Sequence, residues 1–472
     1  MSVPRFVVVG HVNRGKSSVV STLAADESVR IASDAPTTLE CRTFPMRVND
    51  RVLYELIDTP GFERPRQMLQ WLREHETTTG QRRHVVEQFV REHAGDPMFD
   101  KECKLLKPVL EGAAVLFVVD GSVPFTEQHE YEMQIIQWTG QPRMALINMI
   151  HEENYIDQWR PVLDQYFNLV HEFDAHEASF HDRIRLIRAL REIHKPWEAA
   201  LNEAIDALMT ERQQHLHDAV AEIASMLVRM LTLVKTKRLS AEADVEPHKE
   251  PLARAYFDEL RRMEARCRDA ISTIYRREQF QVKQSELSAA QDDLFSQDVW
   301  LRFGLSRGKL AAGGAATGAA TGGMIDAAVG GASFLLGAVV GGIVGAGVGL
   351  LSAMSLPRAQ VVGMRMGGKE LRIGPMRNVQ FPWIVLGRAL EHHRIVSGAP
   401  HAKRGSVEAT GEARSAVEQI SDEHRKAINH AFARLRKLPD AVTREEIQFE
   451  LTDRLKTVLA EQEAMEPGAE HV

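Results

Sequence analysis

The residues with the clearest chemical potential follow the first apolar run of the chain. Residues 10–17 read Gly-His-Val-Asn-Arg-Gly-Lys-Ser, which matches the GxxxxGK[ST] phosphate-binding pattern. They lie between a strand-like run, Arg5–Val9, and a helix-like run, Ser17–Ala25. Glycines let the backbone approach a phosphate closely, and the start of the helix directs amide groups and a positive dipole end toward it. We therefore expect Lys16 to reach the β- and γ-phosphates of a nucleotide and the Ser17 hydroxyl to bind Mg²⁺.

Two further polar segments have the spacing that a triphosphate site needs. Asp58-Thr59-Pro60-Gly61 ends a second strand-like run, Val52–Ile57. A carboxylate at the end of that strand can hold Mg²⁺ through water, and Gly61 leaves its amide free to approach a γ-phosphate. Thr37 and Thr38 follow Pro36 in a polar loop between the two motifs. A hydroxyl there can ligate Mg²⁺ and sense the γ-phosphate by ordering the loop, and the alternative is a solvated loop.

Together, these segments resemble the translation-factor-related GTPases, most closely the TrmE–Era–EngA-like bacterial group, over residues 5–175. The resemblance implies GTP and GDP as ligands, with Mg²⁺ ligated by Ser17 and Thr38 and bound through water by Asp58. In that group the asparagine of the phosphate-binding loop coordinates K⁺ in place of an arginine finger, and Asn13 occupies its position. Lys16, Asn13 and Thr38 are then the expected catalytic residues. The expected nucleotide-binding residues are Gly10, Asn13, Arg14, Gly15, Lys16, Ser17, Ser18, Thr37, Thr38, Asp58, Gly61 and Asn148.

Position 62 departs from the pattern of related proteins. Phe62 follows Gly61 where Ras-like proteins carry a glutamine that orients the attacking water. A phenyl ring cannot orient water, so intrinsic hydrolysis should be slow and need K⁺ held by Asn13, or a contact from a partner or a second copy. For Asn13 the alternative role is that of a turn former in the loop.

The base-recognition motif is a second departure. A guanine-specific member carries NKxD after the fifth strand, whereas residues 148–151 read Asn-Met-Ile-His here. Asn148 is kept, but the aspartate that accepts two hydrogen bonds from the guanine edge is replaced by His151. Losing such a paired contact costs about 1–3 kcal/mol. Guanine selectivity is therefore open, and Asp157 or Glu153 are the carboxylates that could compensate.

These motifs need elements that position them, and the first third of the chain supplies an alternation of strand-like and helix-like runs. This alternation predicts an α/β P-loop NTPase fold, a mostly parallel sheet with helices on both faces, over residues 1–195. The strand candidates are Arg5–Gly10, Arg42–Val48, Arg51–Asp58, Ala113–Asp120, Pro142–Ile147 and Asn168–Phe173. About residues 63–112 we expect a helical insertion, with helix-like runs at Arg66–His75, Arg83–His93 and Lys101–Leu110.

The rest of the chain divides into three predicted regions. Residues 196–307 have a helical pattern throughout, typical of a hairpin or bundle, with a break at Glu246–Pro251. Residues 308–357 are glycine-rich, and residues 358–472 predict a small mixed region with strand-like pieces at Lys369–Ile373 and Phe381–Leu386. Short stretches, at 53–58, 141–148 and 380–383, are similar to proteobacterial proteins that join a GTPase domain to an uncharacterised C-terminal region.

The glycine-rich segment has the spacing of a glycine zipper. Between Leu310 and Leu356 the only charged residue is Asp326. Two sets of glycines recur every four residues, which on a helix makes a stripe that another helix can approach closely. The stripes are Gly314, Gly318 and Gly322, then Gly337, Gly341, Gly345 and Gly349. Basic residues flank both ends, so we expect a membrane hairpin with both ends in the cytoplasm. The alternative is a hairpin buried in a soluble protein or at an oligomer contact.

Composition limits the partners and the compartment. The net charge of −7 argues against a nucleic-acid binder driven by bulk charge, so no DNA partner is expected. Cys41, Cys103 and Cys267 form no close pair, which favours free thiols in a reducing cytosol. We therefore expect a protein at the cytoplasmic face of the bacterial inner membrane, or in the cytoplasm, with membrane lipid or a second copy as partners.

The leading functional hypothesis is a Mg²⁺-dependent P-loop GTPase that couples GTP binding and hydrolysis to a helical, membrane-associated effector region. Two alternatives stay open. One is a nucleotide-gated membrane scaffold with little hydrolysis, and the other is a soluble GTPase associated with the ribosome or RNA.

Overall fold

The computed structural model describes residues 3–10, 15–24, 40–48, 51–151, 153–175, 178–275, 293–295, 299, 303, 357–364, 368–398 and 416–464. The chain forms two units. The first consists mainly of Met1–Arg212, and the second mainly of Gln213–Ser397 and Gly405–Ala469.

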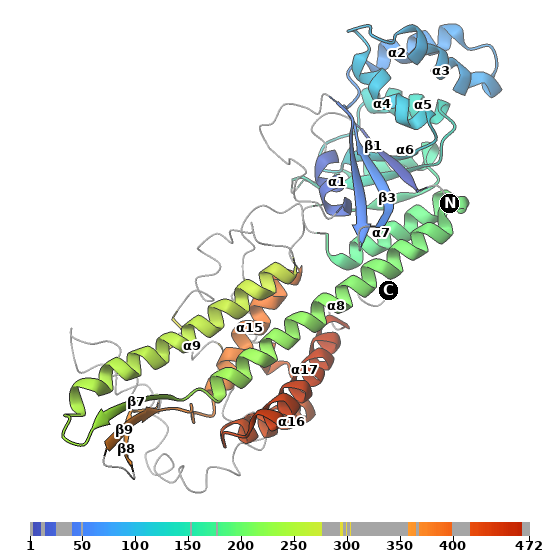
Figure 1. Cartoon of the computed structure of the whole chain (residues 1–472). Helices are drawn as coiled ribbons and strands as arrows, with labels where there is room; N and C mark the ends of the chain where they lie inside the picture. The colour runs from blue at the N-terminus through green and yellow to red at the C-terminus, as the bar shows by residue number, and fades with distance from the viewer. Residues whose placement is uncertain are drawn as a thin grey trace. The chain divides into compact units, whose positions relative to one another are not determined.

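A six-stranded sheet lies at the centre of the first unit, with the order β2-β3-β1-β4-β5-β6 (Figure 1). β2 pairs antiparallel with β3, and every other neighbouring pair is parallel. The mostly parallel sheet and all six strand candidates are thereby confirmed, with small shifts at the strand ends. The strands are β1 (Arg5–Val9), β2 (Arg42–Val48), β3 (Arg51–Asp58), β4 (Ala114–Asp120), β5 (Arg143–Asn148) and β6 (Val170–Glu172).

Helices cover both faces of this sheet because successive strand residues point to opposite sides. Phe6 and Val8 of β1 belong to one hydrophobic cluster, and Val7 and Val9 belong to the other. The first cluster is completed by α1 (Lys16–Ala24), α7 (Phe180–Ile193) and the start of α8 (Glu198–Leu231). The second is completed by α2 (Pro65–His75), α3 (Arg82–Glu92), α4 (Asp100–Leu110), α5 (Glu127–Trp138) and α6 (Ile156–Tyr166).

Between β3 and β4 the chain forms α2, a short 3₁₀ turn (Thr79–Gln81), α3 and α4. The three helix-like runs expected between residues 66 and 110 are confirmed at these positions. The apolar residues of α2 and α3 that recur at helical spacing are the buried ones, such as Met68 and Leu72 or Val86 and Phe89. This helical segment therefore packs on the sheet face opposite α1.

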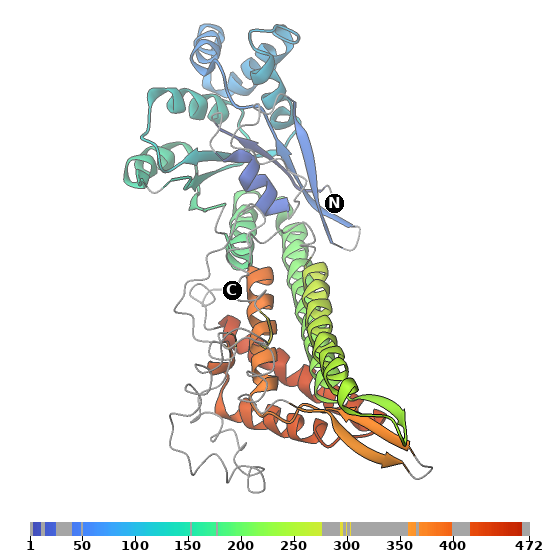
Figure 2. The ribbon, with the colours of Figure 1, turned by 90° about the vertical axis from the view of Figure 1, so that its left-hand side faces the viewer.

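The second unit is mainly helical and contains a small sheet (Figure 2). One hydrophobic cluster joins the C-terminal part of α8 to α9 (Glu246–Ile274), α15 (Phe381–Gly398), α16 (Asp422–Leu435) and α17 (Ala441–Ala464). The sheet is antiparallel in the order β7-β9-β8, with strands β7 (Lys235–Ser240), β8 (Gln360–Met364) and β9 (Gly368–Ile373). β9 confirms the strand expected at Lys369–Ile373.

The strand expected at Phe381–Leu386 is wrong, because these residues begin helix α15. When every residue of a run is buried, apolar residues do not alternate with polar ones. The sequence then shows neither the two-residue period of a strand nor the 3.6-residue period of a helix. The start of the helix comes from Asn378, whose Oδ1 accepts hydrogen bonds from the amides of Gln380 at 2.8 Å and Phe381 at 3.2 Å. An asparagine in this place satisfies amides that the first helical turn leaves unpaired.

The helical pattern expected throughout residues 197–307 is also wrong in one place. Lys235–Ser240 form β7, an exposed polar strand that has no strand signal of its own and is held by its pairing with β9. The break expected at Glu246–Pro251 is wrong too, since α9 begins at Glu246 and continues through Pro251. Pro251 lies inside the helix, in its second turn, where it removes one backbone hydrogen bond without ending the helix.

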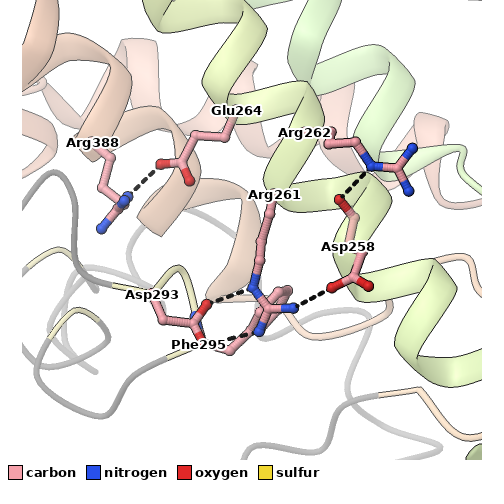
Figure 3. Close-up of polar contacts among 7 residues, drawn as sticks. All are labelled: Asp258, Arg261, Arg262, Glu264, Asp293, Phe295 and Arg388. Carbon is pink, nitrogen blue, oxygen red and sulfur yellow. Dashed lines mark hydrogen bonds and ion pairs between the residues drawn. The ribbon is translucent and has the colours of Figure 1, made fainter.

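Charged side chains lie inside the helical core of the second unit (Figure 3). Arg388 of α15 and Glu264 of α9 form an ion pair with side chains only 3% and 8% exposed. Nearby, Arg261 makes two hydrogen bonds to Asp293, at 2.8 and 2.9 Å, and one to Asp258 at 3.0 Å (Figure 3). Removing one partner of a buried pair leaves an uncompensated charge, so Arg388 and Glu264 fix α15 against α9.

The expected membrane hairpin at 308–357 lies outside the described residues, apart from Pro357. In the part of the chain that the structure describes, no helix has both the length and the hydropathy to cross a bilayer.

Candidate nucleotide-binding site

Two glycines of the phosphate-binding motif stand where no other residue fits. Gly10 directly follows β1 with φ +147°, and a Cβ there would lie 2.2 Å from the carbonyl oxygen of Val118 on β4. Gly15 precedes α1 with φ +79°, and a Cβ there would lie 2.3 Å from Nδ2 of Asn148. Such positive φ angles are strained for residues with a side chain. The glycines of the motif are therefore required by the turn and by its close neighbours.

The two described residues expected at Mg²⁺ lie together. β1 and β3 are parallel neighbours with Val8 beside Asp58, which brings the end of β3 next to the start of α1. The Ser17 hydroxyl donates a hydrogen bond to Oδ2 of Asp58 at 3.0 Å. Asp58 is 4% exposed and Lys16 is 7% exposed. A hydroxyl and a carboxylate are the hard oxygen ligands that Mg²⁺ prefers, so this pair fits the ion that the motif implies.

The loop after Asp58 is buried rather than solvated. Thr59 donates a hydrogen bond from Oγ1 to the carbonyl of Val8 at 2.7 Å, and Gly61 is buried. Phe62 is fully buried in the cluster beneath α2–α6. Its ring therefore forms part of the core, and position 62 presents no polar group to a water molecule.

A buried glutamate holds the next part of this loop. Oε1 of Glu102, in the first turn of α4, accepts hydrogen bonds from the amides of Glu63 at 2.8 Å and Arg64 at 2.6 Å. Lys101 forms an ion pair with Glu63 at 2.9 Å. Sequence reasoning missed Glu102, since an acidic residue in the first turn of a polar helix is typical of a solvated surface. Glu102 differs from such a surface residue only in its hydrogen bonds to two backbone amides about forty residues earlier in the chain.

At the opposite end of the site, Asn148 orders a neighbouring loop. Its Oδ1 accepts a hydrogen bond from the amide of Ala175 at 2.9 Å, and Thr22 of α1 donates to the carbonyl of Ala175 at 2.9 Å. Asn148 is fully buried, and among the described residues its Nδ2 has no hydrogen-bond partner. A buried donor without a partner is costly and is expected to meet a ligand. Asn148 therefore joins the loop at 174–175 to the phosphate-binding turn and retains one donor.

The other described residues of the base motif are less buried than Asn148. Met149 packs against Gly121, where its Sδ is 2.6 Å from the position of a Cβ. His151 is exposed, and so are Asp157 and Glu153, the carboxylates considered as compensation. No described residue therefore supplies a buried carboxylate in the place of the missing aspartate of this motif.

Several expected site residues lie outside the described residues, namely Asn13, Arg14, Thr37 and Thr38. Ser18 is buried in the first turn of α1. Among the described residues, no group of three or more His, Cys, Asp or Glu side chains could hold a metal ion. The three cysteines are free thiols, and burial raises the pKa of Cys267 to about 12.

Two family models match the chain. The family described as 50S ribosome-binding GTPase matches residues 5–149. The domain of unknown function DUF3482 matches residues 160–460. The comparison with curated proteins gives no match.

Solved structures of Era are similar to part of the chain. One is Era in complex with MgGDPNP and nucleotides 1506–1542 of 16S ribosomal RNA, at 18% identity and a TM-score of 0.29, with 41% of this chain and 57% of that chain covered. The chain thus spans little more than half of that structure's length. Another is an Era variant from Aquifex aeolicus bound to GDP.AlF4−, at 18% identity and a TM-score of 0.28, with 58% and 90% covered.

The expectation of a GTPase domain joined to an uncharacterised C-terminal region is confirmed by the two family models. Residues 5–149, with the glycine turn and the Ser17–Asp58 pair, form a P-loop GTPase domain. Because the second model matches more than half of the 472 residues, the chain belongs to the DUF3482 family.

Proposed function

We propose that this protein is a Mg²⁺-dependent GTPase whose nucleotide-sensing loops act on the helical region that follows. The observation that carries the proposal is the hydrogen bond between Ser17 and Asp58, placed beside Lys16 at the start of α1. A hydroxyl from the P-loop and a carboxylate from the neighbouring strand are the pair that binds Mg²⁺ in P-loop nucleotide sites.

Several of the expected site residues have a proposed role at the triphosphate. Lys16 would neutralise charge on the β- and γ-phosphates, and the amides at the start of α1 would surround them. The amide of Gly61 would donate to the γ-phosphate. Mg²⁺, held by Ser17 and through water by Asp58, would supply further neutralisation of the oxygens on which charge develops. Thr38 is proposed as a second direct ligand of the ion.

Hydrolysis is proposed to need help beyond these residues. Phe62 is buried, so it offers no group to orient the attacking water. K⁺ bound by Asn13, or a residue supplied by a partner or a second copy, would fill this role. Without such help we expect a protein that binds the triphosphate and turns it over slowly.

We propose a weak preference for guanine. Asn148 is the retained member of the base motif, and its oxygen already accepts the amide of Ala175. His151 stands in the place of the aspartate and is exposed. These observations favour recognition of the base mainly through Asn148 and the surrounding loops, with little discrimination between guanine and adenine.

The proposed effector role depends on the glycine-rich segment. The glycine spacing between Leu310 and Leu356 favours insertion into inner-membrane lipid, or self-association, at the cytoplasmic face of the membrane. A nucleotide-gated scaffold with little hydrolysis and a soluble ribosome- or RNA-associated GTPase are the rival functions. Carbonate extraction of membranes tests insertion, because release of the intact protein contradicts it, and the rate of hydrolysis separates the scaffold from the GTPase.

Turnover of GTP and ATP, each with Mg²⁺ or with EDTA and each in K⁺ or Na⁺, tests the enzymatic part. We expect phosphate release that needs Mg²⁺ and is faster in K⁺. Equal rates in the two salts would remove Asn13 as a K⁺ ligand and leave the rest intact. Absence of binding to any nucleoside di- or triphosphate would overturn the proposed function itself.

A further inference from the structure

Helix α4 contacts the segments that follow both expected nucleotide-sensing loops. Glu102 accepts the amides of Glu63 and Arg64, directly after the Asp58–Gly61 motif. Two residues later, Lys104 forms an ion pair with Glu40 at 2.6 Å, just after the loop that holds Thr37 and Thr38. The carbonyl of Lys104 also accepts a hydrogen bond from the Cys41 thiol at 3.3 Å. One helical turn of α4 thus holds the chain on both sides of β2 and β3.

Of these contacts, the one made by Glu102 is the strongest. Its side chain is fully buried, whereas Lys104 and Glu40 are partly exposed. Hydrogen bonds from amides to a buried carboxylate are charge-assisted and stronger than those between neutral groups. An exposed ion pair adds little by comparison.

The arrangement of Glu102 is not explained by stability alone. Among the described residues, its second oxygen, Oε2, is buried without a hydrogen-bond partner. A buried carboxylate oxygen without a partner is costly, and this cost offsets part of what the two amide hydrogen bonds contribute to stability. The two amides that it does accept lie just beyond Gly61, the residue expected to donate to the γ-phosphate.

A loop that must be ordered before it can bind a ligand loses affinity, because fixing its backbone costs conformational entropy. Glu102 fixes residues 63 and 64, and Phe62 is fixed by burial in the core. The amide of Gly61 is then set in place before the nucleotide binds. A diphosphate has no γ-phosphate and gains nothing from this ordering.

We propose that Glu102 is a positioning residue for recognition of the γ-phosphate: it holds the amides of Glu63 and Arg64 and thereby places Gly61. The proposal rests on the proposed function above. It identifies α4, acting together with the buried Phe62, as the part of the domain that organises this loop.

The test compares affinities for GDP and for the nonhydrolysable analogue GMPPNP, by calorimetry with Mg²⁺, in the full chain. We expect Glu102→Ala to weaken GMPPNP binding about tenfold while GDP binding changes less than about twofold. Glu102→Gln keeps an oxygen acceptor and should restore most of the lost affinity. Glu132→Ala is the matched control, because it removes another fully buried carboxylate, on α5 of the same unit, and should not change the ratio of the two affinities.

The outcomes separate this proposal from the one it rests on. If the unmodified chain binds neither ligand, both fail. If Glu102→Ala weakens GDP and GMPPNP equally, Glu102 has only a structural role and the GTPase proposal stands. Hydrogen exchange on the unmodified chain decides the matter if the alanine variant does not fold. The amides of Glu63 and Arg64 should be protected in the nucleotide-free chain as well as with GDP or GMPPNP, and rapid exchange in the nucleotide-free chain would overturn the proposal.

Discussion

The phosphate end and the base end of the nucleotide site differ in how much of their expected chemistry they keep. At the phosphate end, both glycines are sterically required, and Ser17 contacts Asp58 beside the buried Lys16. At the base end, Asn148 alone is retained, and its oxygen accepts a backbone amide. The aspartate is replaced by an exposed histidine.

This difference shows which part of the site the fold itself demands. Gly10 and Gly15 touch β4 and Asn148, and Asn148 in turn holds the loop at Ala175. These residues support one another, so a change in one of them disturbs the turn. Met149 lies against Gly121 and His151 is exposed, so neither supports the turn through a described contact. The described residues therefore keep the expected features of the phosphate end more completely than those of the base end.

The largest expected effect is that of replacing Lys16, and its absence would contradict the comparison between the two ends of the site. Lys16→Ala should weaken binding of both GDP and GTP analogues on the order of 100-fold, because truncating one partner of a buried charge contact costs about 2–5 kcal/mol. Calorimetry measures it. Lys107→Ala, which removes an exposed lysine from α4, is the control and should leave affinity unchanged. Retained affinity in the Lys16 variant would mean that the phosphate end is not the binding determinant.

The contact between the two ends can be tested through Gly15. Gly15→Ala should lower the free energy of unfolding by about 2 kcal/mol, from the strained backbone and from displacement of Asn148. Gly140→Ala is the matched control, because Gly140 also has a positive φ of +67° but nothing within 4 Å of a Cβ. Urea denaturation measures both variants. Equal losses in the two would show that the contact with Asn148 contributes nothing.

Restoring the lysine and aspartate of the base motif should have the smallest of these effects. It tests whether the base end limits the preference for guanine. Met149→Lys combined with His151→Asp should raise the preference for GDP over ADP about tenfold, because a carboxylate can accept two hydrogen bonds from guanine. Asp157→Asn removes an exposed carboxylate nearby and serves as the control. A strong guanine preference in the unmodified chain, or its loss with Asp157, would show that the base end is already complete.

The features that the sequence predicts well are those with a local signal. Strands β1, β3, β4 and β5 of the first unit are short, mainly buried runs, and the bounds of all six strands are close to those expected. The glycine turn and the strand that ends at Asp58 were identified from spacing alone, and the structure brings Ser17 and Asp58 within hydrogen-bond distance.

The features that the sequence does not reveal depend on distant partners. β7 is exposed and polar, and its pairing residues lie after the glycine-rich segment, at Gly368–Ile373. Phe381–Leu386 look like a strand because burial removes the helical period, while the capping role of Asn378 is visible only in three dimensions. Glu102 acts on amides rather than on side chains, so no pattern of residue types marks it.

The pairing of β7 with β9 has a consequence for the glycine-rich segment between them. Phe303, before the segment, and Leu371, after it, belong to the same hydrophobic cluster. Residues on both sides of the segment therefore pack in the same hydrophobic core of the second unit. A force on the segment would therefore reach the core of the second unit through both of its ends.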